Sequence, residues 1–191
     1  MSKNLSITLD LGCGRDKIAA ATHERVIGID HQLSPDVDLI ANLESPLPLA
    51  DNSVDKIYSN HTFEHLAHAK QLIEDCWRIT KSQGQIFIRV PHYSHNSMYT
   101  DLTHQTFFSS RSLDYYLPGT YLEQMSGYPA NIRFNLIQKR IFFDLPYKPL
   151  EFLVNLNNTS RKIYEWFFAW IFPARELVFI LSPIKSDHLT T

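Results

Sequence analysis

Residues 9–17 read LDLGCGRDK, in which Gly12 and Gly14 follow directly after a run of apolar residues. The run itself, SITLDL at 6–11, is typical of a short buried strand that ends at glycine. Glycine adopts unusual backbone angles and lets a ligand approach the main chain closely. Ligands of open parallel sheets bind outside the carboxyl ends of the strands. We therefore expect these glycines to form a ligand-binding turn at the end of the first strand.

Strands and helical segments alternate along the first half of the chain. We expect strands at 6–11, 25–30, 37–43, 54–60 and 85–91. Helices are expected at 17–24 and at 66–80, where apolar residues recur at helical spacing. This alternation predicts an α/β fold: a Rossmann-like, mostly parallel twisted sheet with helices on both faces. Further on, we expect a strand at 133–144, apolar helices at 150–172 and a last strand at 176–184.

Composition narrows the class of protein. The 191 residues suffice for one domain, 1–191, with a core of its own. A net charge of -2 and a pI of about 6.5 give no electrostatic case for nucleic acid as a partner. Before the first glycine turn there is no apolar stretch of signal-peptide length, and Cys13 and Cys76 are too few for a disulfide framework. We therefore expect a cytoplasmic protein with two reduced thiols.

A carboxylate at the end of the second strand narrows the class of ligand. Asp30 follows Asp10 by 20 residues, a placement that suits a carboxylate holding two ribose hydroxyls. Dinucleotide-binding turns have a third glycine where this chain has Lys17, because helix and strand pack closely there. A lysine side chain does not fit that crossing. The pattern therefore favours S-adenosylmethionine, which has no pyrophosphate, over a nicotinamide dinucleotide.

Four motifs together resemble the class I S-adenosylmethionine-dependent methyltransferases of the type 11 kind. They are LDLGCGRDK, VIGID, LPLADNSVD and EHL, and the resemblance covers roughly residues 7–92. The segment 101–108 has the pattern D-x-T-H-x-x-F-F and resembles a bacterial subgroup of this family, which supplies no substrate. The resemblance implies the class I fold, S-adenosylmethionine as cofactor and methyltransferase activity.

The resemblance also implies which residues bind the cofactor: Asp10, Gly12, Cys13, Gly14, Asp30, Asn42, Leu43 and Asn60. The first four line its methionine end, the fifth binds the ribose, and the residues that end the third strand meet the adenine. The family usually has Asp where Asn42 stands. Because an amide still accepts a hydrogen bond through its carbonyl oxygen, we expect binding to survive this difference.

Methyl transfer from a sulfonium is an in-line displacement, so alignment of the reactants contributes most, about 7–11 kcal/mol from proximity alone. A hydroxyl acceptor also needs a proton acceptor near pH 7, and histidine suits this task. His61 ends the fourth strand and is expected to lie nearest the methyl donor. It either accepts the proton or only shapes the pocket. Glu64, three residues on, is expected to complement a helix N-terminus.

A second candidate cluster follows the fifth strand. Asp101 and His104 lie three residues apart, on one face if helical, and His92 precedes them. These three either form an acid–base group or hold a divalent metal. Alternatively, Asp101 and Thr103 cap a helix and His104 bonds to the loop. We count His61, His92, Asp101 and His104 as the catalytic candidates and predict no bound metal.

The aromatic C-terminal segment allows three interpretations. Ile163, Tyr164, Phe167, Trp170 and Ile171 recur at helical spacing. They form a core helix, a substrate lip or a membrane-surface helix for a lipid-linked acceptor. The chain starts almost at its first strand, without the N-terminal helices that often close the site in this family. We therefore place the cofactor-binding core at 6–92 and expect lids from 93–131 and 145–175.

These observations predict an S-adenosylmethionine-dependent methyltransferase. Its expected acceptor is a small molecule or a glycan-like or lipid-linked compound. The membrane-surface interpretation of the C-terminal segment adds peripheral contact with a membrane through 150–172. We expect transfer to oxygen, because histidines surround the site and SNHT stands where nitrogen methylation motifs have NPPY. A catalytically silent S-adenosylmethionine-binding module and a nicotinamide-dependent oxidoreductase are the alternatives.

Overall fold

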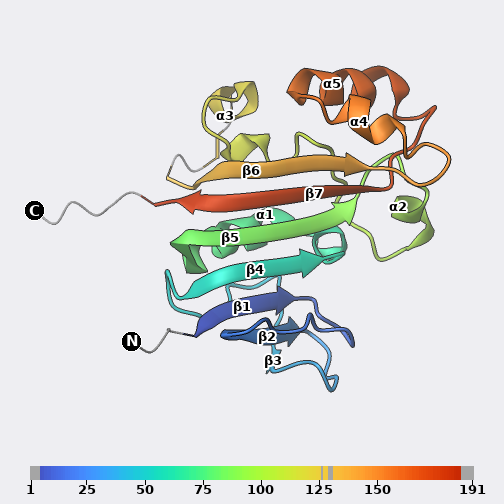
Figure 1. The fold of residues 1–191 in the computed structure, drawn as a ribbon. Helices are drawn as coiled ribbons and strands as arrows, with labels where there is room; N and C mark the ends of the chain where they lie inside the picture. Colours follow the sequence, from blue (N-terminus) through green and yellow to red (C-terminus); the bar gives the residue numbers. More distant parts are fainter. Residues whose placement is uncertain (1–4, 126, 129–130, 186–191) are drawn as a thin grey trace, which may run out of the picture.

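The computed structural model describes residues 5–125, 127–128 and 131–185. Its strands form one seven-stranded sheet in the order β3-β2-β1-β4-β5-β7-β6 (Figure 1). The strands are β1 Ser6–Leu11, β2 Glu24–Asp30, β3 Leu39–Ile40, β4 Val54–Asn60, β5 Thr80–Pro91, β6 Arg133–Phe142 and β7 Glu176–Ile184. The first five are parallel, and β7 lies antiparallel between β5 and β6. The predicted fold class, Rossmann-like and mostly parallel, is confirmed.

Apolar runs predicted the strands with few corrections. The first, fourth and last strands have the expected bounds. The third is only Leu39–Ile40, because the Asp38 carboxylate before it is bound to the Gly28 N–H at 2.7 Å and to Lys17 Nζ at 2.8 Å. Asp38 lies in a bend with these contacts, and pairing with β2 starts at Leu39, two residues after the expected start at 37.

The helices are short, apart from one. The described helices are α1 Ala69–Ile79, α2 Ser97–Thr100, α3 Tyr121–Met125, α4 Leu150–Val154 and α5 Asn158–Ile163. A π-helical turn, η3 Tyr164–Phe168, continues α5, and 3₁₀ turns form at η1 Phe63–His65 and η2 Asp114–Tyr116. Every helix among the described residues is too short or too polar to cross a bilayer.

The helix expected at 17–24 is not formed, and residues 12–23 contain no helix. Two carboxylates bind the backbone of this segment instead. Asp10 accepts a hydrogen bond from the Ile18 N–H at 2.8 Å, and Glu24 accepts one from the Ala21 N–H at 3.0 Å. Such side-chain acceptors compete with the helical pattern for backbone N–H groups, and here they replace it.

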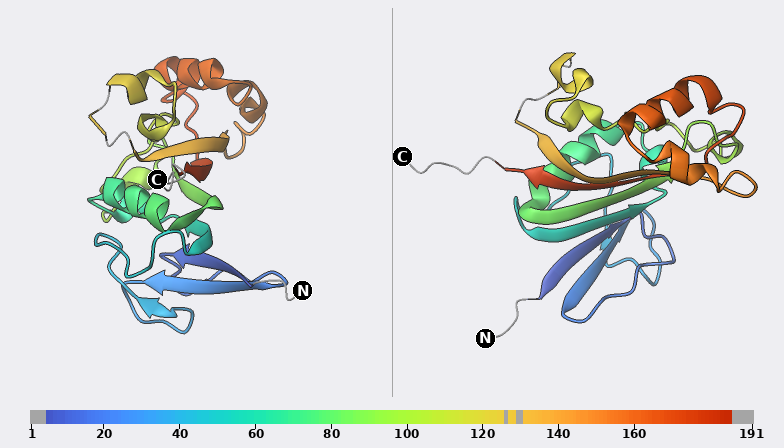
Figure 2. Two further views of the ribbon diagram at one scale, coloured as in Figure 1. Left: turned by 90° about the vertical axis from the view of Figure 1, so that its left-hand side faces the viewer. Right: turned by 45° about the horizontal axis from the view of Figure 1, so that its top comes forward.

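The main core lies between the sheet and α1. Ile57, Ile86 and Ile88 point from β4 and β5 toward this helix and are at most 1% exposed, and Leu72 and Cys76 face them from α1. Burying a side chain of this size contributes roughly 1.5–3 kcal/mol. Figure 2 shows α1 on one side of the sheet and α4 on the other, beside β6.

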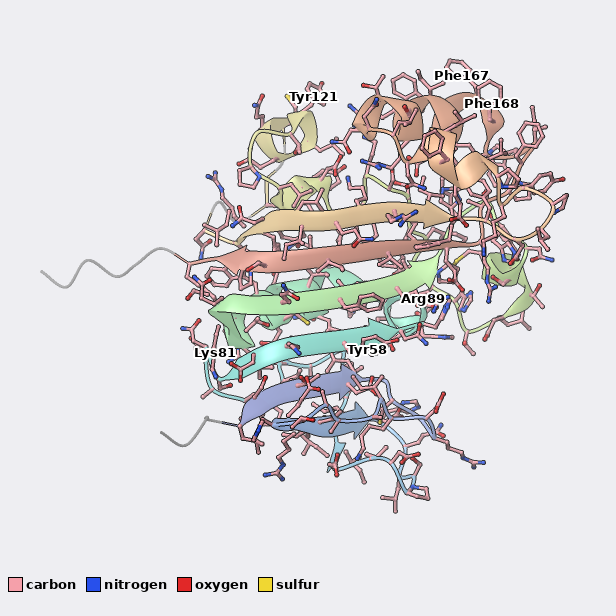
Figure 3. All side chains as sticks on the ribbon, viewed as in Figure 1. Tyr58, Lys81, Arg89, Tyr121, Phe167 and Phe168 are labelled. Atoms are coloured by element: carbon pink, nitrogen blue, oxygen red, sulfur yellow. The ribbon has the colours of Figure 1, made fainter. Side chains whose placement is uncertain are left out.

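The opposite face is covered only in part. Residues 12–23 and 31–38, which connect the first three strands, contain no helix, so the expected cover in front of β1 and β4 is not formed. Tyr58 and Phe87 lie on this face, partly exposed, with their rings stacked at 4.8 Å. Figure 3 shows Tyr58 in front of the sheet, where no helix covers it.

Ionisation of the Glu24 side chain makes the free energy of unfolding depend on pH. Its carboxylate accepts from the Thr8 hydroxyl at 2.5 Å and the Ala21 N–H, and Lys56 lies 3.2 Å away, so these partners lower the pKa of Glu24 to about 2. A lowered pKa contributes stability above the unfolded-state value of about 4.3, and this is lost as the pH falls toward 2. Glu24→Gln removes the contribution. We expect the difference in unfolding free energy between wild type and this variant to shrink from about pH 5 to about pH 3 in urea titrations; a constant difference would contradict this assignment.

Candidate functional site

Two neighbouring cavities open at the carboxyl ends of the parallel strands. The first has a volume of about 750 Å³, and the glycine turn and the ends of β2 and β3 line it. The second has a volume of about 880 Å³ and lies over the ends of β4, β5 and β7. Four residues line both cavities: His61, His65, Leu102 and Thr103. The two cavities therefore share a wall.

The glycine turn forms as expected at the end of β1. Gly12 and Gly14 have φ values of +68° and +55°, a left-handed region that favours glycine. A Cβ on Gly12 would lie 2.3 Å from the Oγ1 atom of Thr62. That hydroxyl donates to the Leu11 carbonyl at 2.8 Å, so the turn lies directly against the end of β4. Only glycine fits at position 12 without displacing Thr62.

Asp30 connects the glycine turn to β2. Its carboxylate accepts hydrogen bonds from the Gly14 N–H at 3.0 Å and from the Gln32 N–H at 2.9 Å. The side chain is buried but lines the first cavity. The exposed His31 Nδ1 lies 3.1 Å from Oδ1, so the lone pair left unused is on Oδ2, where a ligand hydroxyl can donate. This is the position and the chemistry expected of a ribose-binding acid.

Asn42 and Leu43 also line the first cavity, as expected for the adenine end. The Asn42 Oδ1 atom accepts from the Glu44 N–H at 2.9 Å, which fixes the amide orientation. One lone pair of this carbonyl oxygen remains for a further donor. The predicted cofactor residues Gly12, Asp30, Asn42 and Leu43 are thus brought to one cavity.

Other predicted cofactor residues lie behind the cavity wall or beside it. Asp10 is 3% exposed, and its carboxylate holds the loop through the Ile18 N–H. Cys13 is buried, and burial raises the pKa of its thiol to about 11, so it is unreactive near neutral pH. Asn60 is exposed at the end of β4. None of Asp10, Cys13 and Asn60 is among the residues that line the two cavities.

His61 lies in the shared wall, in an unusual backbone conformation with φ +55°. Its Nδ1 atom is 3.0 Å from Glu64 Oε1, and its Nε2 atom is 3.4 Å from Glu176 Oε1. Hydrogen bonds to Glu176 and Glu64 raise the pKa of His61 to about 9. The ring is therefore an imidazolium near neutral pH, with both N–H groups directed at carboxylates. In this arrangement it has no free nitrogen to accept a proton.

Glu176 is the centre of a charged network on the same wall. It is 4% exposed and accepts from Arg89 Nε at 2.6 Å, while Arg175 Nε lies 3.0 Å away. Hydrogen bonds from His61 and Arg89 outweigh its burial and lower its pKa to about 2. Figure 3 shows Arg89 at the carboxyl end of β5, beside this network. The antiparallel register, which pairs Pro91 with Glu176, brings the carboxylate to the site.

The loop after α2 supplies another part of the lining of the second cavity. Asp101 accepts from the Thr103 N–H at 2.8 Å and from the Thr103 hydroxyl at 2.7 Å, the geometry of a side chain that closes a turn. His104 Nδ1 is 3.2 Å from the Met98 carbonyl, and its ring lies 4.7 Å from that of His65. The carboxylate of Asp101 is 4.0 Å from His104 Nε2. Asp101 and His104 are therefore brought together as predicted.

His92 lies elsewhere. It is fully buried, with Nδ1 2.8 Å from Ser94 Oγ and Nε2 3.3 Å from Glu165 Oε1. Glu165 also accepts from the Ser110 N–H and hydroxyl. His92 thus joins β5 to the π-helical turn and lines neither cavity. The set of His92 with Asp101 and His104, expected from sequence as an acid–base group or metal site, is not assembled.

Several site residues had no local signal in the sequence: Thr62, Arg89, Arg175 and Glu176. Thr62 follows the predicted strand end by two residues, and its contact with Gly12 depends on strand order. Arg175 and Glu176 look like a break between two apolar runs. Only the position of that break, at the start of a strand paired with β5, would have indicated the site.

Residues 9–88 match the model of a family described as a methyltransferase domain. The match covers the glycine turn, Asp30, Asn42 and two residues of the shared wall, His61 and His65. A probable S-adenosylmethionine-dependent methyltransferase from Mycolicibacterium smegmatis is 29% identical over 96 residues, which are 44% of this chain and 37% of that protein. The chain thus matches little more than a third of its relative. Family and relative imply S-adenosylmethionine as the cofactor.

Solved structures have the same fold at low sequence identity. A putative methyltransferase from Bacillus halodurans has a TM-score of 0.61 and 12% identity, with 96% of this chain and 94% of that one covered. An S-adenosylmethionine-dependent methyltransferase from Archaeoglobus fulgidus has a TM-score of 0.54 and 17% identity, over 93% and 86% of the two chains. At these identities the likeness establishes the Rossmann-like fold.

Replacing Gly12 tests the cavity wall. Gly12→Ala places a methyl group against Thr62 in a backbone conformation that disfavours side chains, so we expect a loss of stability on the order of 1–3 kcal/mol. We also expect at least tenfold weaker binding of S-adenosylhomocysteine, measured by fluorescence titration of the folded variant. The control is Gly119→Ala, which has φ +78° but open space around its Cβ. Equal affinity of both variants would contradict this role of the turn.

Proposed function

We propose that this chain transfers the methyl group of S-adenosylmethionine to a hydroxyl oxygen of a small, glycan-like or lipid-linked acceptor. The observation that carries the proposal is the pair of adjoining cavities. Gly12, Asp30 and Asn42 face the first, which suits the cofactor, and histidines and hydroxyl-bearing residues face the second, which suits a polar acceptor. The shared wall with His61 is where donor and acceptor would meet.

In this proposal, each residue of the first cavity has one task. The bare backbone at Gly12 admits the methionine end, Asp30 accepts hydrogen bonds from the ribose hydroxyls, and Asn42 accepts from the adenine amino group. S-adenosylmethionine supplies a methyl group already activated by the positive sulfur. The acceptor oxygen forms a bond to this carbon as the carbon–sulfur bond breaks, and the hydroxyl proton leaves to a base.

The proton acceptor is better sought in the second cavity than at His61. His61 donates to carboxylates from both nitrogens, so it is suited to orient and balance charge in the wall. His104 uses Nδ1 toward the Met98 carbonyl, which leaves its Nε2 with a lone pair. We therefore assign proton acceptance to His104, and to His61 a positioning role.

A methyl-transfer assay tests the proposal. The purified chain is incubated with S-adenosylmethionine labelled in its methyl group and with glycolipid and polar-metabolite extracts. We expect the label to appear in a product that resists alkaline hydrolysis, as a methyl ether does. His104→Ala should lower the initial rate at least tenfold, as is typical of a lost acid–base group. If no extract is labelled while S-adenosylhomocysteine binds, the chain is instead a silent binding module.

An exposed apolar surface supports a lipid-linked acceptor. Its large, exposed side chains lie between positions 145 and 171: Leu145, Phe152, Leu153, Leu156, Ile163, Trp166, Phe167, Phe168, Trp170 and Ile171. We call them the apolar rim. Figure 3 shows Phe167 and Phe168 projecting outward beyond the β6 edge of the sheet. Clusters of this kind mark interaction sites, because single exposed apolar residues are normal but contiguous ones are not.

Charge and position favour an anionic membrane as the occupant of the apolar rim. The two carboxylates of the segment that carries the rim are bound within the protein: Glu151 accepts a hydrogen bond from the Phe143 N–H, and Glu165 is buried. Lys148 is exposed and Lys162 partly exposed. Tryptophan and lysine beside apolar side chains suit the boundary of a bilayer. We therefore propose peripheral contact with the anionic, cytoplasmic face of a membrane.

The segment that carries the apolar rim begins and ends at the acceptor cavity. The segment that carries it starts after Asp144 and ends before Arg175, and these two residues both line the second cavity. Their side chains pair, with Arg175 Nη1 3.1 Å from Asp144 Oδ1. A membrane bound to the rim would therefore lie close to the cavity mouth, where a lipid-linked acceptor would be presented.

Vesicle binding tests this contact. We expect the wild-type chain to sediment with vesicles of phosphatidylcholine and phosphatidylglycerol, and less so in high salt. The double variant Trp166→Ala/Phe167→Ala should lower the bound fraction at least fivefold. Leu33→Ala, at an exposed leucine (79%) outside the rim, is the control. The proposal is overturned if the wild-type chain forms a dimer in the absence of vesicles and the double variant does not. The apolar rim would then bind a second copy of the chain.

A further inference from the structure

Three potential metal ligands meet in the second cavity: Glu64, His65 and His104. One ligand atom from each lies within 4.8 Å of the others. The first two belong to η1, directly after β4, and the third to the loop after α2. We propose that these three side chains bind a divalent transition-metal ion, a site that the methyl-transfer proposal above does not include.

The two segments that carry the ligands are fixed to each other. The Glu64 carbonyl accepts from the backbone N–H groups of Gln105 at 2.7 Å and Thr106 at 3.0 Å. The Gln105 side chain donates to the His65 carbonyl at 2.9 Å, and the Thr106 hydroxyl to the Leu66 carbonyl at 2.6 Å. The cluster is therefore held by backbone contacts from both sides, and its geometry does not depend on long mobile side chains.

Glu64 has an unused oxygen in a buried place. The residue is 0% exposed, its Oε1 atom contacts His61, and its Oε2 atom has no hydrogen-bond partner. Leaving a buried polar atom unpaired costs about 1–3 kcal/mol, and more for a charged group. Of the unpaired buried atoms in the described residues, this is the carboxylate oxygen, and an unpaired buried carboxylate oxygen needs a partner such as an ion or a water molecule. A cation bound to this carboxylate, which lines the second cavity, would supply it.

Hydrogen bonds determine which ring nitrogen of His65 is available to bind a metal. Asp101 accepts the hydroxyl proton of Thr103, with 2.7 Å between the oxygens, so this hydroxyl is free only to accept. His65 Nδ1 lies 2.8 Å from the same hydroxyl and must therefore be the donor. This leaves the lone pair of His65 on Nε2. A chain of carboxylate, hydroxyl and imidazole is the kind of support that orients metal-ligating histidines.

His104 is oriented in the same way. Its Nδ1 atom lies 3.2 Å from the Met98 carbonyl, an obligatory acceptor, so Nδ1 carries the hydrogen. The lone pair of His104 is then on Nε2, as in His65. Asp101 lies 4.0 Å from that nitrogen and adds negative charge near the site. In both imidazoles Nδ1 is the hydrogen-bond donor, which leaves Nε2 as the nitrogen that can bind a metal.

Two imidazoles and one carboxylate define the class of metal. This donor set suits zinc, iron(II), manganese and cobalt(II), and it leaves coordination positions open for water or a substrate oxygen. Magnesium and calcium prefer sites built from oxygen alone. The metal assigned here therefore has open positions facing the second cavity, where the proposed acceptor lies.

The ion has a direct use in the proposed reaction, and this part of the inference rests on the proposed function. An acceptor hydroxyl bound to the ion would lose its proton more readily, because the positive charge stabilises the oxyanion. The proton passes to water, because the Nε2 lone pair of His104 is bound to the ion in this form and no longer serves as the base. The oxyanion then forms a bond to the methyl carbon while the carbon–sulfur bond breaks, which leaves a methyl ether and a neutral thioether.

Cobalt(II) alone tests the site, because its visible absorption reports coordination by protein ligands without any activity assay. We expect one equivalent to bind the metal-free chain and zinc to displace it. His104→Ala and Glu64→Gln should each weaken binding at least tenfold. Asp101→Ala should weaken it about 10–100-fold, because the Thr103 hydroxyl that orients His65 loses its acceptor. His95→Ala is the control, since His95 lines the same cavity outside the cluster.

The outcomes separate this inference from the methyl-transfer proposal. Loss of cobalt binding in the variants, with His95→Ala unchanged and all variants folded by circular dichroism, supports the site. No stoichiometric binding by the wild type, or equal loss in His95→Ala, overturns it. Binding of S-adenosylhomocysteine is measured in parallel and does not depend on the metal. A chain that binds this molecule but no metal therefore refutes the metal site alone.

Discussion

The hydrogen bond between the Gly14 N–H and the Asp30 carboxylate, 3.0 Å long, is the contact on which the site depends. It joins the turn after β1 to the end of β2, so two neighbouring strands present one surface. The left-handed backbone at both glycines is what directs this N–H at the acid. The same turn meets β4 through Gly12 and Thr62. The glycine turn thus positions the cofactor cavity and also the wall that this cavity shares with the acceptor cavity.

Ion pairs connect the charged side chains in and around the shared wall. His61 is bracketed by Glu64 and Glu176, and Arg89 and Arg175 neutralise the latter. This network satisfies the buried charges of β7 and β5, but one oxygen of Glu64 stays unpaired. A hydroxyl acceptor must also lose a proton, and His61 has no nitrogen free to accept it. An ion bound to Glu64, His65 and His104 would pair the unpaired oxygen and would stabilise the oxyanion of a bound acceptor.

Local patterns in the sequence predicted the parallel sheet and half of the site, because strands and glycine turns are encoded by adjacent residues. The apolar runs gave the strands, and the glycine pair with Asp30 gave the first cavity. The helix expected at 17–24 was wrong, since carboxylates of Asp10 and Glu24 bind its N–H groups. His92 was grouped with His104, yet its partner Glu165 lies 73 positions away in the chain. Contacts of that range depend on strand register and packing, which periodicity does not encode.

The account's central claim is that the glycine turn and Asp30 together bind an adenosyl sulfonium. Calorimetric titration of S-adenosylhomocysteine into the wild-type chain and into Asp30→Asn tests it most directly, with NAD as the competing ligand. We expect one molecule of S-adenosylhomocysteine per chain, binding at least tenfold weaker in Asp30→Asn, and no binding of NAD. Binding of NAD in preference, or no heat of binding for S-adenosylhomocysteine in the folded wild type, would contradict the account.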